Sequence, residues 1–102
     1  MYAVVGMWTV DETRQDEQRR LLREEVVPLV SRHPGFVSGY WMHDPETGKS
    51  HTAVIFADRE SAEKFKSFVE RTTRRTALAG LTSDTLSAVE VIASTHLGQE
   101  PL

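Results

Sequence analysis

Four histidines are the side chains of this sequence best suited to acid–base chemistry. His43 and His51 flank a predicted turn, and either is a candidate catalytic base because imidazole exchanges its proton near neutral pH. His33 closes a predicted helix, where a positive charge is favoured, and His96 follows the last predicted strand. A metal site generally needs three or more ligands, and at most two of these imidazoles can meet, so we predict no metal site.

The turn between His43 and His51 decides whether these two imidazoles meet. A four-residue loop, Pro45–Gly48, pairs Asp44 with Lys49 and sends the imidazoles to opposite faces of the sheet. A loop one residue longer would pair them directly, with Cβ atoms about 5 Å apart. The sequence leaves both registers open, and hairpin histidines that merely face solvent fit it equally well.

Aromatic residues form the second candidate group. A flat aromatic ligand such as a quinone suits a cleft lined by aromatic side chains with one or two polar groups, although core or dimer packing explains the same residues. Side chains alternate along a strand, so Trp8 and Trp41 share a pocket only if both point toward the helices. The candidate pocket residues are Trp8, Tyr40, Trp41, Phe56 and Phe65.

A small basic cluster, Arg71, Arg74 and Arg75, precedes the segment Ala77–Leu81, which we predict to be a short helical turn or flap. The cluster could draw an anionic substrate to this segment, or it could simply be a solvated helix end. No glycine-rich phosphate loop, serine nucleophile elbow or paired-carboxylate motif occurs in the sequence.

Four runs of apolar and β-branched residues predict the strands that position these groups. They are Tyr2–Val10, Phe36–His43, His51–Ala57 and Leu86–Thr95. The turn Asp44–Gly48 joins the second and third runs into a hairpin. The first and third runs are apolar on both alternating sets, which is typical of strands covered on both faces.

Two amphipathic segments predict helices. The first, Thr13–Arg32, contains Pro28, which removes one backbone hydrogen bond and is expected to kink the helix. The sequence His33–Gly39 (HPGFVSG) ends it and leads into the second strand. The second helix starts after Asp58, a predicted N-cap, and its buried stripe contains Ala62, Phe65, Phe68 and Val69.

The resulting β-α-β-β-α-β order predicts an α+β protein with the ferredoxin-like fold. We expect a four-stranded antiparallel sheet with both helices on one face and the first and third strands in the middle. Residues 1–96 form a single domain in this interpretation, and residues 97–102 form a polar C-terminal tail.

Two helices cover only one face of such a sheet, and the other face keeps an apolar set. The sequence does not say whether this set is Val4 and Trp8 or Ala3, Val5 and Met7. At about 25 cal/mol per Å², leaving it in water forgoes several kcal/mol of a small domain's stability. We therefore expect a homodimer that buries the open sheet face, although a monomer with a mildly apolar face is the alternative.

Composition narrows the function classes. The chain has 102 residues, 39% of them hydrophobic, a formal charge of −3 and no cysteine. The charge argues against a nucleic-acid clamp, and the absence of a 20-residue apolar run argues against a membrane span. The lack of cysteine suits a reducing compartment, so we expect a cytoplasmic protein.

The sequences His33–Gly39 and Phe56–Phe65, at the junctions into the second strand and out of the third, resemble the dimeric α+β barrel proteins similar to the antibiotic biosynthesis monooxygenases. The resemblance covers nearly the whole chain. It implies a ligand cleft between sheet and helices in each subunit, with the sheets of two subunits closing the barrel.

The resemblance also implies an activity, namely oxygenation of a small aromatic or polycyclic compound without a cofactor. Such a protein positions and deprotonates an electron-rich substrate, which then reacts with O₂. Haem-degrading relatives share an Asn on the first strand, a Trp at the start of the second helix and a His along it, and this sequence lacks those residue types there. The alternative is a non-catalytic homodimer that binds a small ligand or another protein.

Overall fold

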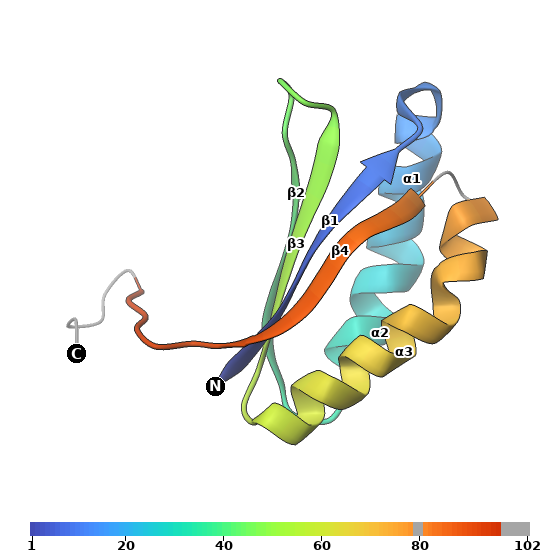
Figure 1. Cartoon of the computed structure of the whole chain (residues 1–102). Helices are drawn as coiled ribbons and strands as arrows, with labels where there is room; N and C mark the ends of the chain where they lie inside the picture. The colour runs from blue at the N-terminus through green and yellow to red at the C-terminus, as the bar shows by residue number, and fades with distance from the viewer. Residues whose placement is uncertain (79–80, 97–102) are drawn as a thin grey trace.

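The computed structural model describes residues 1–78 and 81–96, without the side chains of residues 73–78 and 81. In this part of the chain, four strands form one antiparallel sheet in the order β2-β3-β1-β4. The strands are β1 Tyr2–Val10, β2 Phe36–His43, β3 Lys49–Phe56 and β4 Leu81–Glu90. The helices cover one face of the sheet and leave the other bare (Figure 1). The predicted ferredoxin-like α+β fold, with the first and third strands in the middle, is confirmed.

The segment predicted as one helix, Thr13–Arg32, consists of successive helical pieces. They are a 3-10 turn η1 (Glu12–Arg14), α1 (Gln15–Leu21), a π-helical segment η2 (Leu22–Val26) and α2 (Val27–Ser31). The carboxylate of Asp11 starts them by accepting the Thr13 N–H at 3.0 Å. Hydrogen bonds from the Thr13 hydroxyl and N–H lower the pKa of Asp11, which keeps the carboxylate charged at the helix start.

The kink predicted at Pro28 takes the form of the π-helical segment. The Val27 N–H bonds to the carbonyl of Leu22, five residues earlier, where an α-helix would use the fourth. A proline ring clashes with the carbonyl four residues before it, here that of Glu24. The wider turn just before Pro28 relieves this clash and keeps the helix continuous.

The second predicted helix, α3 (Arg59–Leu78), begins as expected. The Ser61 N–H donates to Asp58 Oδ1 at 2.8 Å, and this hydrogen bond lowers the pKa of Asp58. The helix runs on to Leu78, so the separate turn or flap predicted for Ala77–Leu81 is wrong as far as Leu78. Residues 79–80, and the side chains of Arg74 and Arg75 from the predicted basic cluster, lie outside the described part of the structure.

Two strand boundaries also differ from the prediction. The last strand, predicted as Leu86–Thr95, lies five residues earlier, because β4 pairs with β1 from Tyr2↔Glu90 to Val10↔Leu81. Pairing along all of β1 keeps the polar stretch 82–85 in the sheet and leaves 91–96 outside it. The third strand begins at Lys49, not His51, and ends at Phe56, not Ala57.

The pairing register assigns each strand residue to a face. Even-numbered residues of β1 and β3 point toward the helices and form most of the core with residues of α2 and α3. The buried core residues are Val4, Val30, Val54, Phe56, Ala62 and Phe65. The opposite side, which we call the open face, carries the odd-numbered set with Ala3, Val5 and Met7. None of the helices in the described residues is long and apolar enough to cross a membrane.

The turn from α2 into β2 depends on Gly35. Its φ is +80°, a region that side chains disfavour, and its carbonyl accepts the Ala57 N–H at 2.8 Å. A Cβ atom here would lie 2.7 Å from the Cβ of Ser61, which is held by its bond to Asp58. The turn therefore fixes β2 against the start of α3.

We predict that Gly35→Ala lowers the free energy of unfolding by about 2–3 kcal/mol, since backbone strain of about 1–2 kcal/mol adds to the clash with Ser61. Gly48→Ala is the matched control. Gly48 has φ +74°, but its Cβ would meet only the flexible end of Glu12. Its loss should be near 1 kcal/mol. Equal losses in urea unfolding of the two variants would contradict the role of Ser61.

Candidate functional site

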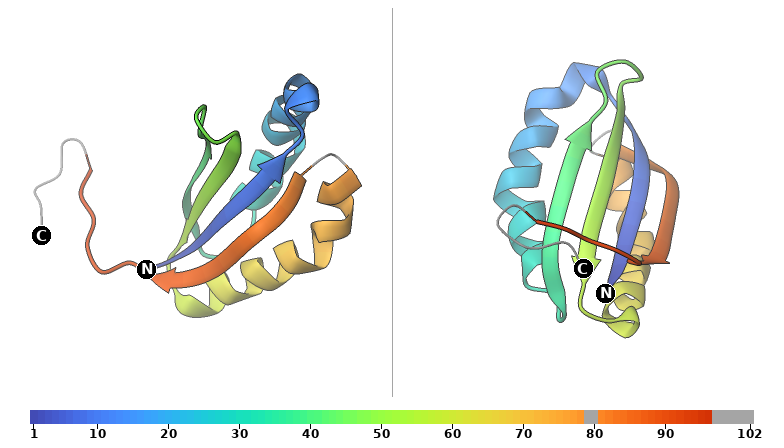
Figure 2. Two further views of the ribbon diagram at one scale, coloured as in Figure 1. Left: turned by 45° about the horizontal axis from the view of Figure 1, so that its top comes forward. Right: turned by 90° about the vertical axis from the view of Figure 1, so that its left-hand side faces the viewer.

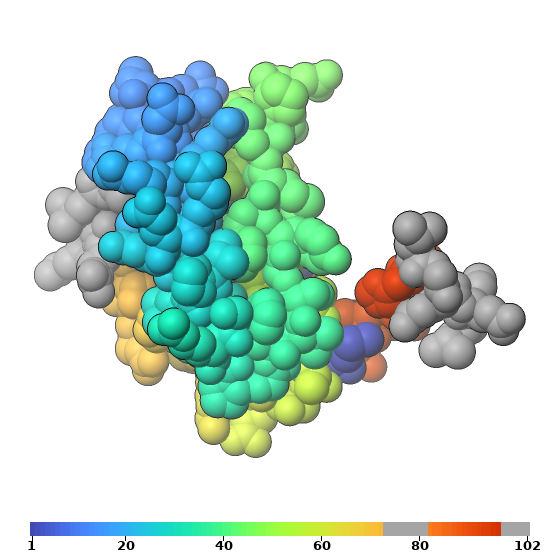
Figure 3. Space-filling model, turned by 180° about the vertical axis from the view of Figure 1, so that it is seen from behind, coloured from blue at the N-terminus to red at the C-terminus, as the bar shows by residue number. Residues whose placement is uncertain are grey.

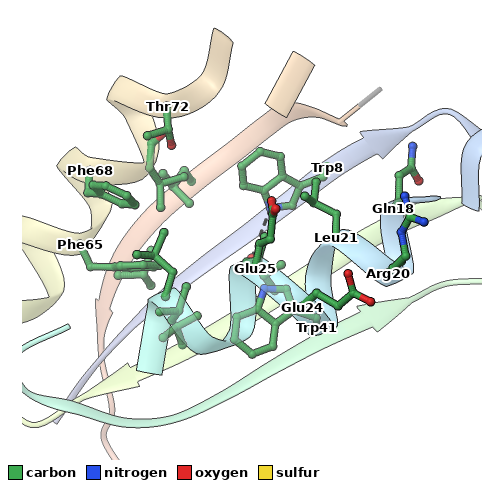
Figure 4. A pocket seen from close by; sticks show the side chains of 18 of the residues that line it. Trp8, Gln18, Arg20, Leu21, Glu24, Glu25, Trp41, Phe65, Phe68 and Thr72 are labelled. Carbon is green, nitrogen blue, oxygen red and sulfur yellow. Dashed lines mark hydrogen bonds between the residues drawn. The ribbon is translucent and has the colours of Figure 1, made fainter. Parts of the chain in front are cut away.

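A cavity of about 580 Å³ lies between the sheet, the first helical segments and α3. We call it the α3-side cavity. Its apolar walls come from Leu21, Val26, Leu29, Val30, Phe65, Phe68, Val69, Leu86, Val4 and Val54. Its charged lining residues are Arg14, Glu17, Arg20, Glu24 and Glu25. Figure 4 shows Trp8 and Trp41 projecting into the space beneath α1, across from Phe65 and Phe68 on α3.

A second cavity of about 530 Å³ lies on the other side of α1, toward the β2–β3 hairpin. We call it the hairpin-side cavity. Its lining includes Arg19, Leu22, Arg23 and Val27 from the helical segments and His43 and Ser50 from the hairpin. This side of the molecule faces the viewer in Figure 3, where α1 lies beside the hairpin.

The two cavities share the same inner walls. Trp8, Gln18, Val26, Trp41 and Thr52 line both of them. The cavities therefore adjoin beneath α1, and two indoles stand where they meet. A flat aromatic ligand would find indole surfaces from either side.

Each indole lies over a glycine two residues before it in the same strand. A Cβ at Gly39 would be 2.8 Å from Cη2 of Trp41, and a Cβ at Gly6 would be 3.0 Å from Nε1 of Trp8. The absence of side chains at Gly6 and Gly39 lets the indoles lie low over the sheet. The space above them then remains open beneath α1.

Two hydrogen-bonded polar side chains, Thr52 and Gln18, lie beside the indoles. The Trp8 Nε1–H donates to Thr52 Oγ1 on the neighbouring strand at 3.3 Å. Gln18, whose exposed fraction is 5%, donates from Nε2 to the carbonyl of Asp11 at 3.2 Å. A buried amide and a half-buried hydroxyl therefore lie among the aromatic walls, as a site that orients a polar aromatic ligand requires.

The structure separates the two histidines proposed as catalytic bases. His43 pairs with Ser50 and Met42 pairs with His51, so the four-residue loop sets the register. The Asp44 N–H donates to the Lys49 carbonyl at 2.9 Å, which fixes this arrangement. His43 lies on the helix side and lines the hairpin-side cavity, whereas His51 lies on the open face.

The aromatic residues predicted to line a pocket lie in three different places: the cavities, the core and the open face. Trp8 and Trp41 line both cavities, and Phe65 lines the α3-side cavity. Phe56 is fully buried and packs edge-on against Phe36 and at 5.1 Å from the Phe65 ring, which makes it a core residue. Tyr40 is 54% exposed on the open face and lines neither cavity.

His33 behaves differently from the helix-end cation expected from its position. Its ring packs 5.1 Å from Phe65 and 4.9 Å from Phe68. This burial lowers the pKa of His33, so the neutral imidazole is favoured. Apolar packing outweighs the attraction of the helix terminus here, and His33 supports the wall that Phe65 and Phe68 give to the α3-side cavity.

Sequence reasoning missed several residues that line the cavities, chiefly Gln18, Arg19, Arg23 and Thr52. Two signals could have found the region. One is Pro28, since the π-helical segment it requires lines both cavities, and π-helical turns often occur at functional sites. The other is the repeated Gly-x-Trp pattern, at 6–8 and 39–41.

Comparison with known proteins identifies related chains. The sequence matches the family model for antibiotic biosynthesis monooxygenase over residues 1–80. A candidate antibiotic biosynthesis monooxygenase from Deinococcus radiodurans has a TM-score of 0.74 and 12% identity, covering 94% of this chain and 97% of its own. No curated protein matches the chain.

Two further solved structures are similar in fold. SnoaB, a cofactor-independent oxygenase from Streptomyces nogalater, has a TM-score of 0.67 and 17% identity, covering 96% of this chain and 97% of its own. A dimeric ferredoxin-like protein from an uncultured marine organism has a TM-score of 0.62 and 12% identity, covering 93% and 97%. Identities this low establish the shared fold only.

The Gly39–Trp41 contact predicts the effect of a single methyl group. In a Trp8→Phe background, where Trp41 is the only tryptophan, Gly39→Ala should displace the indole and shift its fluorescence maximum and acrylamide quenching. Overpacking should also cost about 1–2 kcal/mol of stability. Ser38→Ala, at the adjacent position on the open face, is the control and should leave the fluorescence maximum and the acrylamide quenching unchanged. An unshifted Gly39→Ala spectrum would show that the indole does not rest on Gly39.

Proposed function

We propose, from the premise that this chain belongs to the antibiotic biosynthesis monooxygenase family, that it oxygenates a small aromatic or polycyclic compound without a cofactor. The observation that carries the proposal is the pair of indoles at the junction of two adjoining cavities. A polycyclic ring system is flat and apolar, and it gains most from contact with such walls.

The unfilled volume of the α3-side cavity supports the proposal that a ligand binds there. Phe65 and Phe68 could have filled the space between α3 and the sheet. They lie instead in the wall, and about 580 Å³ remains beside them. This volume lies within the range of small-molecule sites, roughly 300–1,000 Å³.

His43 is the base in this proposal. An anthrone-type substrate loses a proton from its ring CH₂ to the imidazole, and the resulting carbanion transfers electrons to O₂. A hydroperoxide forms at that carbon and eliminates water, which leaves a carbonyl. One oxygen atom of O₂ enters the product and the other leaves as water, so substrate and O₂ balance without another reductant.

In the same proposal, a second copy of the chain binds to the open face. Its partly exposed apolar side chains are Val5, Met7, Tyr40, Met42, Ala53, Ile55 and Val89. They form a contiguous set across all four strands, because the register places each of them on the open face, with Tyr40 opposite Ala53 and Met42 opposite His51. Patches of this kind mark interaction surfaces, and a two-fold axis buries both copies at once.

The chain beyond β4 supports this assembly. After Glu90 it leaves the sheet on the open side (Figure 2). Ile92 belongs to this segment, and 92% of its surface is exposed. A partner seated on the open face would cover this isoleucine along with the sheet, which joins two apolar surfaces in one interface.

We expect His43→Gln to reduce the turnover of a hydroxylated anthrone by about 100-fold or more, since the substrate then lacks its proton acceptor. His51→Gln should keep most of the activity, because the sheet separates His51 from both cavities. An oxygen electrode measures both variants against the rate without protein.

Three outcomes would overturn parts of this assignment. A His43→Gln variant with unchanged turnover would remove His43 as the base. If Glu25→Gln, and not His43→Gln, lost turnover, the base would lie in the α3-side cavity. Wild-type protein that binds the anthrone but does not accelerate its oxidation would support the non-catalytic ligand-binding alternative.

We expect Val5→Glu to convert the dimer to monomers, because a carboxylate at the centre of the open face would have to be buried without a partner. Ser67→Glu, on the exposed side of α3, is the matched control and should remain dimeric. Sedimentation velocity at micromolar concentration gives the oligomeric state, and far-ultraviolet circular dichroism confirms that each variant is folded. A wild-type protein that sediments as a single copy would contradict the proposed assembly.

A further inference from the structure

The hairpin-side cavity differs from the α3-side cavity in the charge of its lining. Two arginines, Arg19 and Arg23, line it, and no aspartate or glutamate does. The α3-side cavity also has two arginines, but three glutamates accompany them. The chain as a whole is acidic, with a formal charge of −3, so a cavity whose only formal charges are positive is a local exception.

Arg19 and Arg23 are four residues apart, so they lie on the same side of the helical segment and face the same cavity. Both are exposed, and neither has an ion pair or side-chain hydrogen bond among the residues that the structure describes. Glu17, which precedes them on the helix, is paired with Arg14 at 2.9 Å. The two guanidinium groups therefore keep their donors for a ligand.

The other residues that line the hairpin-side cavity indicate which chemical groups such a ligand contains. Trp8 and Trp41 form the inner wall of the cavity, and His43 lies on its hairpin side. A ring system stacked on the indoles would direct a substituent outward toward α1. Arginine binds carboxylates through two parallel hydrogen bonds, so a carboxylate is the substituent that fits this end.

We propose that the hairpin-side cavity selects aromatic compounds that carry a carboxylate, with Arg19 and Arg23 as the pair that binds it. This inference rests on the proposed function, since it names the class of substrate for that same site. A carboxylate held at α1 would fix the orientation of the ring system, so that one edge of it faces His43. Arg19 and Arg23 then determine the substrate specificity of the site.

The test compares two ring compounds that differ in one substituent, which is charged in one compound and neutral in the other. Anthraquinone carboxylate and its neutral hydroxymethyl analogue are titrated into the full-length protein, and quenching of Trp8 and Trp41, the two tryptophans of the chain, reports binding. The carboxylate should bind at least about fivefold more tightly in low salt, and its advantage should shrink in high salt. Arg19→Gln/Arg23→Gln should abolish the advantage and leave the affinity for the neutral compound unchanged.

The matched control is Arg32→Gln/Arg71→Gln, which removes the same two charges from exposed positions that line neither cavity. It should keep the preference for the carboxylate. If the neutral compound binds as well as the carboxylate, or if the preference survives in Arg19→Gln/Arg23→Gln, the carboxylate site is wrong and the aromatic site stands. If neither compound binds the wild-type protein, the proposed function fails together with it.

Discussion

The alternation of side chains across the sheet is the constraint on which the rest of this structure depends. Because each strand residue points to one face or the other, a single register places Phe56 in the core, Trp41 and His43 beside the cavities, and Tyr40 and His51 on the open face. A shift of one residue in the hairpin would exchange these sets. The turn Asp44–Gly48, with Asp44 accepting the Glu46 N–H at 2.9 Å, therefore determines which imidazole can reach a ligand.

The cavities exist because three local features act together. Gly6 and Gly39 let two indoles lie low over the sheet, and Pro28 widens the helix above them into a π-helical turn. The aromatic contacts of His33 with Phe65 and Phe68 hold the α3 wall in place. Together these features leave room for a ligand between the indoles and α1.

Much of the architecture could be predicted from the sequence because its signals are local. The apolar, β-branched run Tyr2–Val10, the cap at Asp58 and the proline-glycine stop after the first helix each depend on neighbouring residues only. The position of β4 could not be predicted in this way. Its register is set by β1, about 80 residues away, so a polar stretch became strand and an apolar alternating stretch after Glu90 did not.

The sequence by itself determined the fold class, the order of the strands and the apolar character of both sheet faces, because these follow from residue patterns along the chain. Only the tertiary structure decided that His43 and His51 lie on opposite faces, that Trp8 and Trp41 share a wall, and that the arginines of one helix divide between two cavities. These facts depend on hairpin register and on the rotation of a helix over the sheet. Both are set by contacts between residues far apart in the chain, which local pattern does not encode.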